Sequence, residues 1–235
     1  MKPFNTEKPW VYPSVNLWTQ DIIKCLKRLN SFYMKSNGVI LDIGGGLAPI
    51  SEISNLKSYE YILVDPDVKK LNLAPSVIDK RKGYGEKVPV DDNSTDIIVT
   101  SSCLQYMEQS KFFEECHRVL KPGGFIAVHE NGPKNPIILL ARLMQRIIGL
   151  FNKKHWHYRN SIKKYYSPRE VEGFKIIYIN QSGLLTPTML FLQYLNLKQP
   201  LRLYKALLWL DEKLLRILPF LKELTFLSTV IYIKV

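Results

Sequence analysis

The sequence of 235 residues lacks several features that would assign its class at once. No segment approaches the roughly 18 consecutive apolar residues of a membrane-spanning helix. The first residues, Met1 to Asn5, have no apolar core of the secretory type. Cysteine occurs only three times, without the spacing of a metal site. These absences predict a cytoplasmic protein with reduced thiols and no transmembrane helix.

Negative charge is scarce in the C-terminal part of the chain. Residues 133–235 contain 17 Lys and Arg but only 5 Asp and Glu, whereas residues 1–132 contain 16 of each kind. The formal net charge of +12 therefore arises entirely after residue 132. Such a surplus is either a solvated surface or a surface for an anionic partner, and both interpretations stay open here.

A glycine-rich turn after a buried strand is the most informative feature of the sequence. Residues 39–43 are apolar around one acid, Asp42, and predict a strand of a parallel sheet. Gly44, Gly45 and Gly46 follow and allow a sharp turn that a ligand can approach. A second apolar strand then ends in Asp65, about 20 residues further on, where doubly wound folds hydrogen-bond a ribose diol. Together these features predict a nucleotide-type cofactor site.

Pro49 stands where a dinucleotide fingerprint wants glycine or alanine, which disfavours a dinucleotide. With Asp42, Gly44, Gly46 and Asp65, the chain resembles the class I S-adenosylmethionine-dependent methyltransferases. Two further stretches, 83–99 and 118–125, are similar to that family's third and fourth strand region and to its turn into the fifth strand. The resemblance covers residues 39–131 and implies S-adenosyl-L-methionine as the cofactor.

The resemblance also implies a set of cofactor-binding residues. The candidates are Asp42, Gly44, Gly45, Gly46, Asp65, Pro66, Tyr84, Gly85, Ser101 and Ser102. Each polar candidate has a structural alternative, in which Asp42 caps its own loop, Asp65 caps the helix that follows, and the serines cap a turn. Tyr84 stands where many relatives carry an acid that contacts adenine, and its ring either covers adenine or packs outward.

Catalytic residues are not specified by the resemblance, because the family has no universal base. A hydroxyl acceptor would need one, and the candidates are Glu130 at the end of the fifth strand and His155 and His157 further on. The two histidines have no third partner at metal-ligand spacing, so no metal site is predicted.

The order of the elements predicts an α/β, doubly wound, Rossmann-like fold with a mostly parallel sheet and helical C-terminal insertions. The family resemblance implies that the sheet has seven strands and that the last strand is antiparallel and inserted between strands five and six. The strands are expected at 39–43, 60–65, 77–82, 96–101, 125–130, 175–179 and 227–233, and helices at 19–32, from 49, at 67–73 and at 110–120. We expect one methyltransferase domain over 1–235, with an N-terminal lid segment (1–35) and a cofactor-binding core (36–131).

Two basic, leucine-rich insertions, 133–170 and 184–224, are expected on the substrate side or facing a membrane. In the second, Leu203, Leu207, Leu210, Leu214 and Leu218 recur at helical spacing, with Arg and Lys on the flanks, and Pro219 ends the helix. This face either packs internally or lies in the interface of an anionic membrane.

The sequence therefore predicts a methyltransferase for a small or lipid-linked acceptor, cytoplasmic or peripheral on the inner membrane face. The alternatives are an RNA methyltransferase, which the leucine-rich helices disfavour, and a non-catalytic cofactor-binding partner subunit. The acceptor, the methylated atom and the oligomeric state are not specified.

Overall fold

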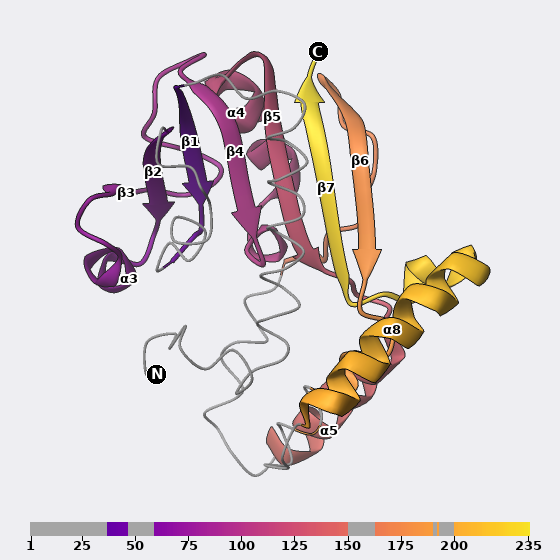
Figure 1. Ribbon diagram of the computed structural model, residues 1–235. Helices are drawn as coiled ribbons and strands as arrows, with labels where there is room; N and C mark the ends of the chain where they lie inside the picture. The colour runs from indigo at the N-terminus through magenta and orange to yellow at the C-terminus, as the bar shows by residue number, and fades with distance from the viewer. Residues whose placement is uncertain (1–36, 47–58, 150–162, 190–191, 193–199) are drawn as a thin grey trace. The chain divides into compact units, whose positions relative to one another are not determined.

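A computed structural model describes residues 37–46, 59–149, 163–189, 192 and 200–235 (Figure 1). Its centre is a seven-stranded sheet in the order β3-β2-β1-β4-β5-β7-β6. The strands are β1 (Gly38–Ile43), β2 (Tyr59–Asp65), β3 (Asp79–Lys82), β4 (Thr95–Ser101), β5 (Leu120–Asn131), β6 (Phe174–Ser182) and β7 (Leu227–Lys234). All seven strands lie where the sequence predicts them.

The strand order creates a switch point between β1 and β4. The chain passes from β1 outward through β2 to β3, and then returns to the other side of β1, where Asp42 pairs with Val99 in a parallel ladder. The connections after β1 and β4 therefore leave in opposite directions. In open α/β sheets, ligands bind at this point, outside the carboxyl ends of the strands.

The last two strands confirm the predicted topology. β7 lies between β5 and β6 and runs opposite to its neighbours (Figure 1). β5 is longer than predicted, because it begins at Leu120, which pairs with Thr95 before an irregularity in the ladder. Gly123, with φ of 74°, lies within this early part of the strand.

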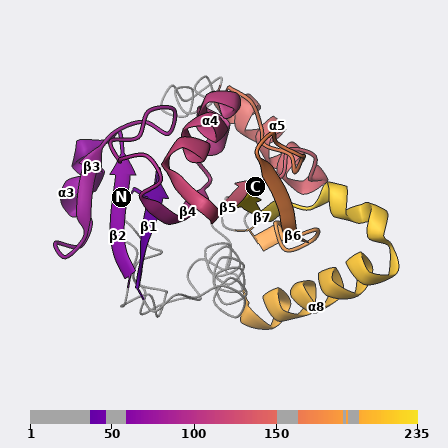
Figure 2. The same cartoon turned by 90° about the horizontal axis from the view of Figure 1, so that it is seen from above.

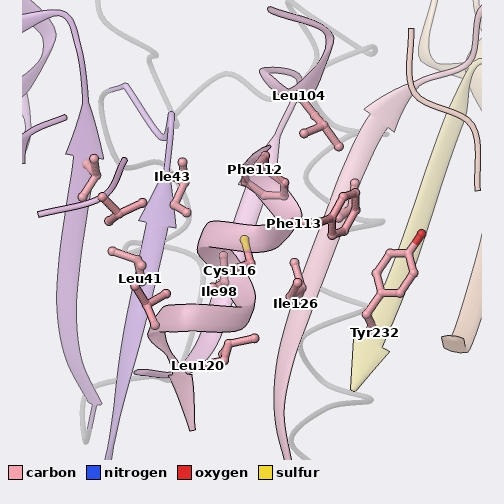
Figure 3. Packing of buried hydrophobic residues seen from close by; sticks show 14 of the residues in the cluster. Leu41, Ile43, Ile98, Leu104, Phe112, Phe113, Cys116, Leu120, Ile126 and Tyr232 are labelled. Carbon is pink, nitrogen blue, oxygen red and sulfur yellow. The ribbon is translucent and has the colours of Figure 1, made fainter. Parts of the chain in front are cut away.

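Helix α4 (Gln109–Val119) covers one face of the sheet (Figure 2). Its buried side chains Phe112, Phe113 and Cys116 face the apolar side chains of β1, β4 and β5 (Figure 3). At the edge of the sheet formed by β3, the short helix α3 (Val68–Leu73) packs on β2 and β3 through Leu71. Both helices lie where the sequence predicts them, and their buried apolar side chains form part of the core. The predicted helices over 19–32 and from 49 lie outside the described residues.

By its internal contacts the chain divides into two compact units. The sheet unit contains β1 to β4, nearly all of β5, most of β6 and β7, and the helices α3 and α4. Among the described residues, the helical unit comprises 131–149, 181–189, 192 and 200–228. It carries α5 (Pro136–Gly149), α8 (Leu201–Ile217) and the 3-10 helix η3 (Pro219–Leu224). No described helix is long and apolar enough to cross a membrane.

The buried face of α8 differs from the predicted leucine face. Tyr204, Asp211 and Leu215 are its buried residues, whereas Leu203 and Leu210 expose more than a third of their surface. Tyr204 packs with Met189 and Leu227, and the leucines at 207 and 208 border this cluster. The buried face of α8 is thus rotated by about one residue from the predicted leucine face, because the ring of Tyr204 and the hydrogen-bonded Asp211 are buried instead of the leucines. The helix ends before Pro219, as predicted.

Candidate active site

Asp42 is fully buried near the carboxyl end of β1. Its Oδ2 accepts a hydrogen bond of 2.5 Å from the Tyr61 hydroxyl, while its Oδ1 has no hydrogen-bond partner among the described residues. Burial raises the pKa of Asp42 to about 7, the nearby Asp65 carboxylate adds to this shift, and the bond from Tyr61 opposes it. One oxygen of this carboxyl group therefore remains available to a ligand.

The three glycines after β1 are required for different reasons. Gly44 has φ of 74°, and a Cβ atom there would meet the Cys103 side chain. A Cβ on Gly45 would overlap the Asp42 carboxylate. Gly46 has φ of 59°, and among the described residues no atom lies closer than 3.5 Å to the place of a Cβ. In the described part of the chain, the loop is thus closed around Asp42 and open at Gly46.

Asp65 is buried at the end of β2 and holds the glycine loop in place. Its Oδ2 accepts a hydrogen bond from the Gly46 amide (3.0 Å), and its Oδ1 accepts one from the Asp67 amide (2.8 Å). The alternative in which Asp65 caps α3 is wrong, because Asp67 is the N-cap and accepts from the Lys69 amide. A carboxylate offers about four acceptor positions, so Asp65 can still accept hydroxyl donors. Pro66 follows it and is exposed.

The serines after β4 do not cap the turn that follows. Glu130 does so from the end of β5, since its Oε1 accepts hydrogen bonds from the Cys103 and Leu104 amides (2.8 and 2.7 Å). Ser101 Oγ is buried without a hydrogen-bond partner in the described part of the chain. Ser102 has a positive φ of 54° and donates its amide to the His129 carbonyl. The capping role of Glu130 was not predicted, because the only signal for it in the sequence is an acid at the end of the strand that lies beside β4.

Tyr84 and Gly85 lie in the loop after β3. Tyr84 is 61% exposed, and its carbonyl accepts from the Lys87 amide in a short antiparallel bridge. Gly85 is buried, and a Cβ there would collide with the Met107 side chain. Gly85 therefore has a packing reason to be glycine, independent of any cofactor.

Of the three catalytic candidates, the structure describes only Glu130. Glu130 is buried and bound to backbone amides, so its position in the described structure is that of a support for the loop after β4. Its neighbour His129 is buried beside Thr229, and burial lowers the pKa of the imidazole to about 3, so it is neutral at pH 7. His155 and His157 lie outside the described residues. Among the described residues, no three His, Cys, Asp or Glu side chains form a group that could hold a metal ion.

These elements bring several predicted residues together at the carboxyl-terminal ends of the strands. Asp42, Gly44, Gly45 and Gly46 follow β1, Asp65 ends β2, and Ser101 and Ser102 end β4, all at the carboxyl side of adjacent parallel strands. Two buried oxygens without hydrogen-bond partners, Asp42 Oδ1 and Ser101 Oγ, belong to this group. The set suits a ligand with both hydroxyl and cationic groups.

Comparison with known proteins agrees with this geometry. Residues 41–128 match the family described as methyltransferase domain. An uncharacterized methyltransferase of Schizosaccharomyces pombe is 25% identical over 138 residues, which cover 57% of this chain and 51% of that protein. An uncharacterized methyltransferase of Mycobacteroides abscessus is 33% identical over 94 residues, or 36% of each chain. The chain thus spans about half or less of the length of these relatives.

Solved structures share the fold. A methyltransferase structure from Thermotoga maritima has a TM-score of 0.59 and 14% identity, covering 97% of this chain and 94% of that one. A phosphoethanolamine N-methyltransferase of Haemonchus contortus, solved with S-adenosyl-L-methionine, has a TM-score of 0.55 and 17% identity, covering 92% of this chain and 52% of that one. Residues 41–128 are thus similar to methyltransferase domains, and the chain shares its fold with solved structures of S-adenosyl-L-methionine-dependent methyltransferases.

Proposed function

We propose that this chain transfers a methyl group from S-adenosyl-L-methionine to a small or lipid-linked acceptor in the cytoplasm. The observation that carries the proposal is a pair of buried oxygens at the ends of neighbouring strands, Asp42 Oδ1 and Ser101 Oγ, which have no hydrogen-bond partner among the described residues. Buried polar atoms are nearly always hydrogen-bonded, so two such atoms at the switch point of the sheet support a ligand site there.

The residues around this loop fit the cofactor in distinct roles. Asp42 would accept a hydrogen bond from the methionine part or balance its positive charge, and Ser101 would bind the same part from β4. Asp65 would accept hydrogen bonds from the ribose hydroxyls, and the open side of Gly46 would let the ligand approach the backbone. When bound, the cofactor supplies an electrophilic methyl group on a sulfonium sulfur.

Methyl transfer requires mainly that the acceptor atom, the methyl carbon and the sulfur are held in line and that water is excluded. The chain's own task is therefore positioning. Glu130 supports this by fixing the amides of Cys103 and Leu104, which follow the serines of β4. We assign Glu130 as a positioning residue for this loop in place of a catalytic base.

Small acceptors are favoured by the known proteins of the same fold. One of the structural neighbours is a phosphoethanolamine N-methyltransferase, named for a small acceptor. We take this as support for the substrate class and not for the substrate itself.

The test is calorimetric titration of the chain with S-adenosylhomocysteine, followed by incubation with radiolabelled S-adenosyl-L-methionine and a cell extract. Saturable binding, with label appearing in the small-molecule or lipid fraction, is the expected result. Binding that is absent, or unchanged in Ser101→Ala and Asp65→Ala, would overturn the proposed site. Tight binding without transfer to any fraction would indicate a non-catalytic partner subunit.

RNA is the second candidate acceptor, favoured by the surplus of Lys and Arg after residue 132. It would appear as label in the RNA fraction that is lost on treatment with ribonuclease. Exposed leucines in the basic helical unit make this the weaker candidate, because phosphate contacts do not need them.

A further inference from the structure

The outward face of α8 combines positive charge with large apolar side chains. Arg202, Lys205, Trp209, Lys213 and Arg216 follow one another at spacings of three and four, so they form one line along the helix, and all five are exposed. Trp209 is 57% exposed, and the Lys213 Nζ atom lies 4.0 Å from the centre of its ring. Glu212 is the acid on this exposed side. The line is therefore strongly cationic around one aromatic ring.

A second, apolar line runs beside the first. Leu203, Leu210 and Ile217 recur every seven residues, and Ile217 is 70% exposed. Phe220 in η3 continues this apolar surface past the end of the helix and is 69% exposed. Large apolar side chains exposed together in this way mark a surface that contacts something else.

The orientation of α8 is fixed from its buried side. Asp211 accepts hydrogen bonds from the Leu185 amide (2.6 Å), the Thr186 amide (3.1 Å) and the Thr186 hydroxyl (3.0 Å). Because this buried carboxylate cannot turn outward without losing three donors, the helix cannot rotate to hide Trp209 and Ile217.

We propose that this face of α8 and η3 docks on an anionic phospholipid surface, with Trp209, Ile217 and Phe220 in the interface and the four cations against lipid phosphates. A helix with cations beside an apolar face lies in the plane of such an interface, and tryptophan prefers this zone. This inference goes beyond methyl transfer and does not depend on it.

Two other occupants fit the face less well. A second copy of the chain would place the same four cations opposite one another, which is repulsive. RNA would be attracted by the cations but would leave Leu210, Ile217 and Phe220 without a partner. Only a surface that is both anionic and apolar matches both lines of the helix.

The test is co-sedimentation with vesicles of phosphatidylcholine and phosphatidylglycerol, compared with pure phosphatidylcholine. The native chain is expected to bind the anionic vesicles and to be released by salt. In a variant with Arg202→Gln, Lys205→Gln, Lys213→Gln and Arg216→Gln, the partition coefficient should fall about 100-fold or more, at roughly fivefold for each cation. Trp209→Ala alone should lower it severalfold.

A matched control removes four exposed lysines from the sheet unit, with Lys82→Gln, Lys111→Gln, Lys164→Gln and Lys175→Gln. It has the same net charge as the α8 variant and should keep nearly all vesicle binding. Failure of the native chain to bind anionic vesicles, or an equal drop in the control, would overturn the proposal. So would retention on RNA without vesicle binding, or a dimer that the α8 variant abolishes.

Calorimetric affinity for S-adenosylhomocysteine separates this result from the proposed function. It should be the same in the native chain and in both glutamine variants. Loss of vesicle binding with an unchanged cofactor affinity would show that the docking face alone had failed, and an absent cofactor affinity with intact vesicle binding would show the reverse.

Discussion

Two buried aspartates, one in each compact unit, differ in how many hydrogen bonds their carboxylates accept. Asp211 in the helical unit accepts three hydrogen bonds from Leu185 and Thr186. Asp42 in the sheet unit accepts one from Tyr61, and its second oxygen has no hydrogen-bond partner among the described residues. Burial raises the pKa of both carboxyl groups. The difference is that the carboxylate of Asp211 is held by hydrogen bonds within its own unit, whereas Asp42 keeps one oxygen that can accept a hydrogen bond from the proposed ligand.

The largest effect is expected from Gly45→Ala, which tests whether the Asp42 carboxylate is fixed in place. The new methyl group would overlap this carboxylate, which cannot move away because it is buried and bonded to Tyr61. We expect cofactor affinity in calorimetry to fall more than 100-fold and the free energy of unfolding to fall by about 3 kcal/mol. Gly123→Ala is the control, since that glycine has a positive φ but nothing within 4 Å, and it should lose only about 1 kcal/mol.

The titration of Asp42 gives the second prediction. Because its pKa is raised from 3.8 to about 7 in the folded chain, the protonated acid stabilises the fold below about pH 4, and this contribution is lost as the pH rises to about 7. Without cofactor, the free energy of unfolding of the native chain should fall by about 4 kcal/mol relative to that of Asp42→Asn across this window. Urea unfolding at several pH values measures it. If the free energy of unfolding changed with pH in the same way in both proteins, the raised pKa of Asp42 would be contradicted.

Asp211→Asn is expected to have the opposite consequence in the helical unit. An amide NH₂ group would face donors that now meet a carboxylate oxygen, so the free energy of unfolding should fall by about 2 to 3 kcal/mol at pH 7. At the same pH, Asp42→Asn should raise it in the cofactor-free chain. Glu212→Gln, next to Asp211 but exposed, should change it by less than about 0.5 kcal/mol. If Asp211→Asn were neutral, the contrast between the two acids would fail.

Asp65→Ala should weaken binding of S-adenosylhomocysteine by about tenfold to 100-fold in calorimetry. The substitution removes the proposed ribose acceptor and also releases the Gly46 amide. Asp67→Ala provides the matched control, because it removes only the N-cap of α3. We expect the control to lose about 1 kcal/mol of stability and to keep its affinity. Equal affinities for the native chain and Asp65→Ala would count heavily against the site.

The smallest effect concerns Glu130 and separates positioning from catalysis. Glu130→Gln keeps an oxygen that can accept from the Cys103 and Leu104 amides, so turnover and affinity should change by only a few fold. Glu130→Ala leaves both amides without an acceptor and should weaken cofactor binding about tenfold. A loss of turnover of 100-fold or more in Glu130→Gln, with a residual turnover whose pH profile is flattened, would instead identify a general base.

Much of the sheet unit could be predicted because its signals are local. The apolar runs of β1, β2 and β4 are short and bounded by turn residues, and the glycines and Asp65 follow them at a characteristic distance. The position of β7 between β5 and β6 was expected from the family resemblance and is confirmed. Only boundaries shifted, as at β5, where pairing of Leu120 with Thr95 extends the strand.

Roles that depend on residues far apart in the chain were not predictable. Asp65 does not cap α3 but accepts from the Gly46 amide 19 residues away, and Glu130 rather than the serines caps the turn after β4, from 27 residues away. The buried side of α8 is turned toward Tyr204 and Asp211, because the acid meets donors about 25 residues away. Helical periodicity alone cannot detect such partners.

The sequence by itself determined the order of strands and helices, the glycine turn after Asp42 and the acid at the end of β2, because each depends on neighbours in the chain. Tertiary structure alone decided which polar atoms are satisfied. The hydrogen bonds of Tyr61 to Asp42, of the Cys103 amide to Glu130 and of Thr186 to Asp211 join residues separated by 19 or more positions, and only folding brings their atoms within bonding distance.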